Sequence, residues 1–258
     1  MKYFVFSDVH GYCSLLKKEL EKKGFDINNE NYMLISLGDN FDRGTENYEM
    51  FLFLKEMHEK NKIILVKGNH EDIFINMIMK GYPSETDKIN GTYGTLNDLY
   101  QKYFETEENI KFAYFIEIYH KLKEVGFINL IDSMLDYYET KNYIFTHGFI
   151  PIDEVNNQYN NNWRDSSYRE FQDSRWTNGI EKSIKYKIGE PNKKIVIGHF
   201  HASYGNVRKD ANDLPEGILK KLEFSSLDLF EPYIDERIIA IDGCTHFSKK
   251  VNVIIIED

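Results

Sequence analysis

Cysteine is scarce in this sequence, since Cys13 and Cys244 are the only two among 258 residues. They form no CxxC pair, and we expect both thiols to be free in a reducing compartment. The amino-terminal stretch MKYFVFSDVHG has no long apolar segment of the kind found in signal peptides. No run of 18 apolar residues occurs, which excludes a transmembrane helix. Together these absences predict a cytoplasmic protein.

Positive charge is also in deficit. The sequence has 32 Lys and Arg against 42 Asp and Glu, and its net charge is −10. Proteins that bind nucleic acids or membrane surfaces in general need an excess of Lys and Arg, so the charge argues against both classes. It does not exclude a small phosphate ester or a phosphorylated protein as substrate, because bound metal ions can supply positive charge locally. Internal repeats and convincing linkers are absent, which predicts one domain over 1–258.

The first third of the chain alternates between short apolar runs and amphipathic stretches. Strands are predicted at Lys2–Phe6, Tyr32–Leu37 and Ile63–Val66. Helices are predicted at Tyr12–Lys23, Glu46–Lys60 and from Asp72 to Met79. This βαβαβ order favours an α/β fold with buried, largely parallel strands.

The region of about 82–138 breaks this alternation. It contains NGTYGT (Asn90–Thr95), followed by stretches with helical character at Leu96–Phe104 and Ile110–Val125. We interpret the region as a helical insertion over one edge of the sheet. Strand character returns in four later stretches: Tyr143–Thr146, Lys194–Ile197, Ile238–Ile241 and Val251–Ile256.

Metal-ligand side chains follow the predicted strands in five short clusters. These are FSDVHG (Phe6–Gly11), LGDNFDRG (Leu37–Gly44), KGNHED (Lys67–Asp72), FTHG (Phe145–Gly148) and IGHFH (Ile197–His201). Ligands of open α/β sheets collect at the carboxyl ends of strands, so the clusters are expected to meet at one rim. Their carboxylates, imidazoles and amide are sufficient for two metal ions, a site typical of in-line displacement at phosphorus.

Two of the clusters are specific enough to suggest roles. In GDNFDRG, the carboxylate of Asp39 is suited to bridging two cations, and Arg43 offers a fork of donors that matches phosphate oxygens. In GNHE, the carbonyl oxygen of Asn69 is a possible ligand. His70 follows directly and should point elsewhere, free to act on protons.

The ordered pattern DxH, GDxxDRG, GNHE, H and GHxH resembles the calcineurin-like metallophosphoesterase superfamily. The DRG and GNHE blocks are similar to its phosphoprotein phosphatase branch, which includes bacterial and phage Ser/Thr phosphatases and diadenosine tetraphosphatases. NGTYGTL (Asn90–Leu96) resembles a loop of the bacterial members. The resemblance implies a four-layer α/β/β/α sandwich of two mixed sheets.

The resemblance also implies roles for individual residues. Asp8, His10 and His201 would hold one metal, while Asn69, His147 and His199 would hold the second, with Asp39 bridging. His70 would be the general acid, supported by Asp42, and Arg43 would bind the phosphoryl group. A second phosphate-binding arginine is expected between His147 and His199, where Arg164 and Arg175 compete and Arg175 is preferred. His201 departs from the phosphatase branch and is closer to phosphodiesterases.

These observations predict a hydrolase of phosphomonoesters that acts through a metal-bridging hydroxide, with protein Ser/Thr phosphatase as the first hypothesis. The ligand set without thiolates suits Mn²⁺, which bacterial relatives often use, and Fe or Zn²⁺ as alternatives. A second hypothesis is a hydrolase of dinucleoside polyphosphates, cyclic nucleotides or RNA ends. Aromatic residues of the insertion would then stack on a base: Tyr93, Tyr100, Tyr103 and Phe104. A third hypothesis is a non-catalytic scaffold that binds a partner. It predicts that metal ligands or the general acid have been lost from the motifs, whereas all seven ligands and His70 are present.

Overall fold

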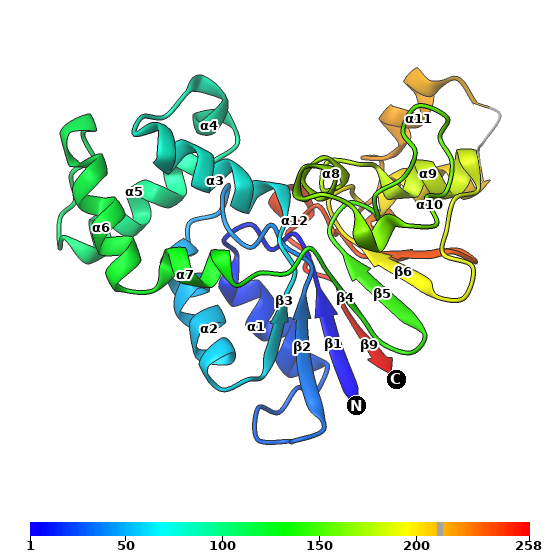
Figure 1. Ribbon diagram of the computed structural model, residues 1–258, viewed down its shortest axis with the longest axis horizontal. Helices are drawn as coiled ribbons and strands as arrows, with labels where there is room; N and C mark the ends of the chain where they lie inside the picture. The colour runs from blue at the N-terminus through cyan, green and yellow to red at the C-terminus, as the bar shows by residue number, and fades with distance from the viewer. Residues whose placement is uncertain (211–213) are drawn as a thin grey trace.

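The computed structural model describes residues 1–210 and 214–258, which are built around two mixed β-sheets (Figure 1). The first sheet has the strand order β3-β2-β1-β9, in which β1 lies parallel to β2 and antiparallel to β9. Its strands are β1 (Lys2–Phe6), β2 (Tyr32–Ser36), β3 (Ile63–Leu65) and β9 (Val253–Glu257). The second sheet has the order β4-β5-β6-β8-β7. Its strands are β4 (Tyr137–Glu139), β5 (Tyr143–Thr146), β6 (Lys194–Ile197), β7 (Tyr233–Ile234) and β8 (Ile238–Ala240).

Successive side chains along a strand point to opposite faces of its sheet, so each sheet contributes to two hydrophobic cores. Phe4 and Phe6 point from β1 into a core shared with helices, whereas Tyr3 and Val5 point into a core between the two sheets. The second sheet behaves in the same way, since Val196 of β6 faces the first sheet while its neighbours Ile195 and Ile197 face a separate core. This period of two is the pleat of a strand buried on both faces. The α/β class with two mixed sheets is thus confirmed.

Helices flank both sheets. The first two helices cover the outer face of the first sheet, the insertion lies beyond its β3 edge, and the later helices near the second sheet lie on its far side (Figure 1). The helices are α1 (Cys13–Lys22), α2 (Asn47–Glu59), α3 (Asn69–Lys80), α4 (Glu85–Ile89), α5 (Thr92–Tyr103), α6 (Phe115–Glu124), α7 (Phe127–Asp132), α8 (Tyr168–Ser174), α9 (Gly179–Tyr186), α10 (Ser203–Asp210), α11 (Glu216–Leu222) and α12 (Thr245–Ser248). Short 3₁₀ turns occur at η1 (Phe112–Tyr114), η2 (Trp163–Asp165) and η3 (Leu227–Phe230).

The predicted elements agree with the structure except at a few boundaries. Helix α3 begins at Asn69 rather than Asp72, so its first turn contains both Asn69 and His70. The region 82–138 is helical as predicted, but strand β4 already begins at Tyr137. Strands β4 and β7 were not predicted, because edge strands this short carry too little hydrophobic periodicity to stand out.

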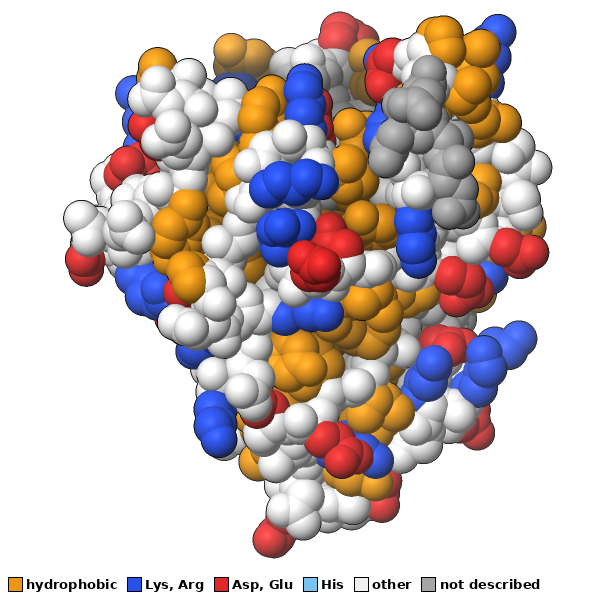
Figure 2. Space-filling view, turned by 90° about the vertical axis from the view of Figure 1, so that its right-hand side faces the viewer, with side chains coloured by type: hydrophobic (Ala, Val, Ile, Leu, Met, Phe, Trp, Pro, Cys, Tyr) orange, Lys and Arg blue, Asp and Glu red, His pale blue; other side chains and the backbone are white. Residues whose placement is uncertain are grey.

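The outer surface beside the second sheet carries mixed side chains. On the face that Figure 2 shows, Lys and Arg are interspersed with Asp, Glu and hydrophobic groups, and the described residues of that face form no continuous field of one charge. Such a mixture differs from the clustered basic surface expected of a nucleic-acid binder. Within the two described stretches, no helix is both long and apolar enough to cross a lipid bilayer.

Candidate metal centre

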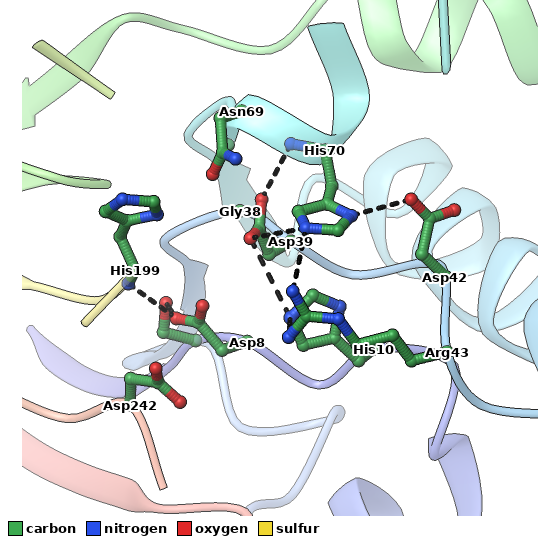
Figure 3. Close-up of polar contacts among 12 residues, drawn as sticks. Asp8, His10, Gly38, Asp39, Asp42, Arg43, Asn69, His70, His199 and Asp242 are labelled. Carbon is green, nitrogen blue, oxygen red and sulfur yellow. Dashed lines mark hydrogen bonds and ion pairs between the residues drawn. The ribbon is translucent and has the colours of Figure 1, made fainter. Parts of the chain in front are cut away.

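The five clusters come together where the parallel strands end. Asp8 and His10 follow β1, Asp39 follows β2, and His147 and His199 follow β5 and β6. Asn69 and His70 form the first turn of α3, directly after β3. The rim predicted from the strand pattern therefore exists, and it draws residues from both sheets (Figure 3).

Asp39 stands at the centre of this rim. Two groups of three side chains each have ligand atoms close enough together to hold a metal ion, and Asp39 belongs to both. The first group adds His10 and His70, and the second adds His147 and His199. One carboxylate oxygen, Oδ1, accepts the backbone N–H of His70 at 3.0 Å and lies 3.3 Å from Nε2 of His147. The other, Oδ2, lies 3.8 Å from Nε2 of His10. A carboxylate with one oxygen toward each group has the arrangement required of a bridging ligand.

Backbone carbonyls fix the orientation of two imidazoles. Nδ1 of His10 lies 2.9 Å from the carbonyl oxygen of Phe41, and Nδ1 of His147 lies 2.7 Å from that of Leu37. Since a carbonyl only accepts, each Nδ1 must carry the proton. In the neutral ring, each Nε2 then has its lone pair directed at the rim, which is the tautomer that metal-binding histidines use. Nε2 of His147 also lies 2.8 Å from Oδ1 of Asn69.

Asp8 joins the two sheets at the rim. Its Oδ2 accepts the backbone N–H of His199 at 2.9 Å and the hydroxyl of Ser7 at 2.5 Å. The imidazole of His199 packs against that of His147, with ring centroids 5.2 Å apart. Burial lowers the pKa of His199 to about 4, so this ring is neutral and available as a ligand at neutral pH.

The chemistry of the donor set fits divalent metal ions. Its members are buried carboxylates, an amide and imidazoles, without thiolates, which is a mixed oxygen and nitrogen set suited to Mn²⁺, Fe or Zn²⁺. Burial, with repulsion from Asp39, raises the pKa of Asp8 to about 6. Burial would lower the pKa of His147, but attraction to Asp39 outweighs it and the pKa is raised to about 9.

Metal binding should therefore release protons and strengthen as the pH rises. Below about pH 6 Asp8 holds a proton, and below about pH 9 His147 holds one, and each must be lost before the side chain can bind a metal. Isothermal titration of the metal-free protein with Mn²⁺ should show weaker binding at pH 5.5 than at pH 8. Titrations in buffers with different ionisation enthalpies should also reveal proton release at pH 7. Affinity that is independent of pH would contradict this assignment of ligands.

A second functional group adjoins the metal cluster. Nδ1 of His70 lies 2.7 Å from Oδ2 of Asp42, and its Nε2 faces the rim. The guanidinium of Arg43 lies between two rings, 3.1 Å from Nε2 of His10 and 3.2 Å from Nε2 of His70. Burial lowers the pKa of His70, but Asp39 and the hydrogen bond to Asp42 raise it more, and the net shift is upward. A protonated imidazole at the edge of a metal site can act as a general acid.

Unusual backbone conformations concentrate at this rim. Non-glycine residues with left-handed φ angles include Asp8 at 52°, His10 at 50°, Asp39 at 52°, Asp42 at 75° and His199 at 63°. Each costs roughly 1–3 kcal/mol unless the surroundings compensate, and such residues cluster at functional sites. These angles turn the chain sharply after each strand, which allows several ligands to converge from loops of a few residues.

Two predicted site residues lie outside the cluster. Nδ1 of His201 lies 2.8 Å from the hydroxyl of Ser203, and its Nε2 lies 3.6 Å from Glu223. Its ring packs against Phe224, with centroids 5.1 Å apart, and neither metal group contains it. The structure thus does not place His201 with the ligands to which the sequence assigned it.

Arg175 is likewise engaged elsewhere. Its guanidinium is buried and pairs with Asp72 of α3 and with Asp136 just before β4. This ion triad ties the first turns of α3 to the segment that packs on Gly148. The side chain is therefore a structural connector in this arrangement. Its competitor Arg164 is also paired, with Glu139 at 2.7 Å and Glu190 at 3.2 Å.

Two acidic residues at the rim were missed by the sequence analysis. Glu71, the last letter of GNHE, accepts the backbone N–H groups of Gly68, Asp39 and Asn40 at 2.9–3.0 Å and so joins the loops after β2 and β3. Asp242 lies beside Asp8, and burial together with repulsion from Asp8 raises its pKa well above the ordinary value. Its position after a predicted strand was the signal that could have found it.

An open cavity of about 560 Å³ lies next to His199. Trp176 lines it and packs edge-on against the His199 ring, with centroids 6.0 Å apart. Phe200 and Tyr204 add two further aromatic walls, and Glu181 and Lys220 add charged ones. Trp176 and Phe200 connect the cavity to the rim, because both rings pack against that of His199.

Comparison with known proteins identifies relatives of this chain. The calcineurin-like phosphoesterase family profile matches residues 1–229. Shewanella-like protein phosphatase 1 of Plasmodium berghei (strain Anka) is 24% identical over 246 residues, which cover 83% of this chain and 63% of that protein. The asymmetrical bis(5'-nucleosyl)-tetraphosphatase PrpE of Bacillus subtilis (strain 168) is 33% identical over 76 residues, or 27% of this chain and 31% of that protein. The chain thus spans less than two thirds of both relatives.

Solved structures agree on the fold. A mutant cold-active protein tyrosine phosphatase superposes with a TM-score of 0.53 at 16% identity, covering 100% of this chain and 75% of the other. The cold-active protein-tyrosine phosphatase of a psychrophile Shewanella sp. gives a TM-score of 0.51 at 15% identity, with the same coverage. At these identities the likeness concerns the fold alone.

Proposed function

The chain belongs to the calcineurin-like phosphoesterase family, and on that premise we propose that it is a metal-dependent phosphomonoesterase with phosphoproteins as substrates. The observation that carries the proposal is the shared position of Asp39 in both metal groups, with His70 alongside. A bridging carboxylate beside a histidine whose Nδ1 is held by a second carboxylate supplies what hydrolysis of a phosphate ester needs.

The proposed ligands divide between two ions. His10 and Asp39 of the first group would hold one ion together with Asp8, which reaches the rim through its bond to the N–H of His199. His70, the third member of that group, is assigned to proton transfer because Asp42 holds its Nδ1. Asp39 would share the other ion with Asn69, His147 and His199. When bound, the ions would supply Lewis acidity at the phosphoryl oxygens and make a water nucleophilic at neutral pH. Mn²⁺ is the first candidate, with Fe or Zn²⁺ as alternatives.

The protein's own side chains would handle the proton and the charge. His70 has its Nδ1–H held by Asp42 and directs Nε2 toward the rim. In the doubly protonated ring, the proton on Nε2 would pass to the leaving oxygen, which would leave the neutral Nδ1–H tautomer. Arg43 would bind the equatorial phosphoryl oxygens through its guanidinium. Its present position between His10 and His70 already places it at the rim.

A nucleotide-derived substrate is the second candidate. The aromatic walls of the cavity beside His199 favour it, since Trp176 is 53% exposed and presents a flat face that a base could stack on. The four aromatic residues of the insertion support it less, because all of them pack in or against the core beside the first sheet: Tyr93, Tyr100, Tyr103 and Phe104. Tyr100 is buried and stacks on Phe104, and Tyr103 packs edge-on against Tyr48.

A hydrolysis panel with chelated protein and returned Mn²⁺ tests the proposal. It contains p-nitrophenyl phosphate, bis-p-nitrophenyl phosphate, a phosphothreonine peptide and diadenosine tetraphosphate. We expect Mn²⁺-dependent hydrolysis of the monoester and the phosphopeptide at rates above those for the diester. Preference for the dinucleotide would establish the second candidate, and hydrolysis that survives chelation would contradict both.

A further inference from the structure

The NGTYGT motif (Asn90–Thr95) leads into helix α5 within the helical insertion and contacts Asp42 and Arg43. Gly91 precedes α5 with a φ of +90°, and a Cβ there would overlap the backbone of Arg43. Thr92 and Thr95 occupy the first turn of α5, three residues apart and hence on one face. Both are fully buried, so neither hydroxyl is exposed to solvent.

Both hydroxyls are directed at one carboxylate. Thr92 donates to Oδ2 of Asp42 at 2.7 Å, and Thr95 donates to Oδ1 at 2.6 Å. The hydroxyl oxygen of Thr95 also accepts the backbone N–H of Asp42 at 3.0 Å. The two threonines thus hold both oxygens of the carboxylate, and Thr95 additionally holds its backbone.

This support is needed because of the conformation of the Asp42 loop. Asp42 has a φ of 75° and Arg43 a φ of 60°, a left-handed pair that costs free energy without outside contacts. Oδ2 of Asp42, which accepts from Thr92, also lies 2.7 Å from Nδ1 of His70. Fixing the plane of the carboxylate therefore fixes the tautomer and the direction of the imidazole.

We propose that Thr92 and Thr95 are positioning residues for His70, and that the insertion serves the reaction by holding the Asp42–His70 pair from outside the metal cluster. This inference rests on the proposed function, because it concerns the proton donor of the same site. It gives the insertion a role in proton transfer that is separate from packing or from closure over a substrate.

Thr95→Val tests the proposal because valine has nearly the same shape and lacks the hydroxyl. In Mn²⁺-loaded protein we expect kcat for phenyl phosphate, a poor leaving group, to fall about tenfold, as for loss of a charge-assisted hydrogen bond. For p-nitrophenyl phosphate, whose leaving group needs little protonation, the fall should be less than about twofold. Thr95→Ser keeps the hydroxyl and should restore the phenyl phosphate rate. Thr86→Val makes the same change as Thr95→Val on the exposed face of α4 and should leave the rates for both substrates unchanged.

A second readout does not depend on activity. Nitrogen-15 NMR of the His70 ring in metal-free protein, recorded at a pH high enough for the ring to be neutral, should show the Nδ1–H tautomer in the wild type and in Thr95→Ser. In Thr95→Val that tautomer should lose population. Circular dichroism and thermal unfolding report whether each variant is folded.

The outcomes separate the two proposals. Equal losses on both substrates with an unchanged His70 spectrum, or failure of Thr95→Ser to restore the rate, would overturn the positioning role. A wild type that hydrolyses nothing would overturn the proposed function. A shift of the His70 tautomer in Thr95→Val would then still support the contact between insertion and histidine.

Discussion

Replacement of Asp39 by asparagine is expected to abolish hydrolysis and to weaken binding of both metal ions. Each carboxylate oxygen of Asp39 faces a different group of ligands, and an amide offers only one oxygen for the two. Loss of partners in the outer sphere of a metal site typically costs about 10–100-fold, so loss of the shared ligand should cost more than about 100-fold.

The fold should survive this change. Asparagine retains the oxygen that accepts the backbone N–H of His70, and it removes a buried charge. Asp132→Asn, on the exposed end of α7, is the matched control and should keep full activity and metal content. Metal content by mass spectrometry, with activity on p-nitrophenyl phosphate, is the measurement. An Asp39→Asn protein that remains active with two ions bound would rule out a bridging role.

Replacement of His70 by asparagine should preserve the metals and lower kcat selectively. Only the proton donor is removed, so esters with poor leaving groups should lose about 10²–10⁴-fold, the usual contribution of general acid catalysis. Esters of p-nitrophenol should lose far less, because their leaving group departs without a proton. The measurement is kcat over a series of aryl and alkyl phosphates.

An exposed histidine provides the control for this series. His120→Asn makes the same substitution at an exposed position of α6, away from the rim, and should leave all rates unchanged. Equal losses for His70→Asn across the whole series would mean that the side chain binds substrate or metal and does not deliver a proton. Metal analysis of the same samples distinguishes between these two alternatives.

Much of the site could be predicted because strand periodicity and motif position agree. Strand β1 has two buried faces, one with Phe4 and Phe6 and the other with Tyr3 and Val5. Asp8 follows the strand directly and therefore lies at the rim. Asn69 and His70 follow β3 by the same logic. Local sequence thus specifies which residues reach the rim, since the carboxyl ends of parallel strands share one edge.

The direction of a side chain beyond the strand end could not be predicted in the same way. His201 is two residues past His199 and directs its ring toward Glu223 and Phe224, which come more than twenty positions later. The local motif of Arg175 suggested a phosphate ligand, but its guanidinium forms ion pairs with Asp72 and Asp136, which lie far away in the sequence. Such partners are set by tertiary packing, which a local pattern does not contain.

Supporting residues were equally invisible in the sequence. Thr95 touches Asp42 across 53 positions, and Glu71 reaches back across 32 to the backbone of Asp39. The left-handed φ angles of Asp8, His10 and Asp39 oppose the ordinary preferences of these residues. They are possible because contacts such as these offset the strain, which is typical of functional sites.

Anomalous X-ray diffraction from crystals soaked in Mn²⁺ is the most direct test of the dinuclear site. We expect two manganese peaks at the rim, one beside Asp8 and His10 and one beside Asn69, His147 and His199, with Asp39 contacting both. A single peak, or peaks that Asp39 does not share, would contradict a dinuclear site bridged by Asp39.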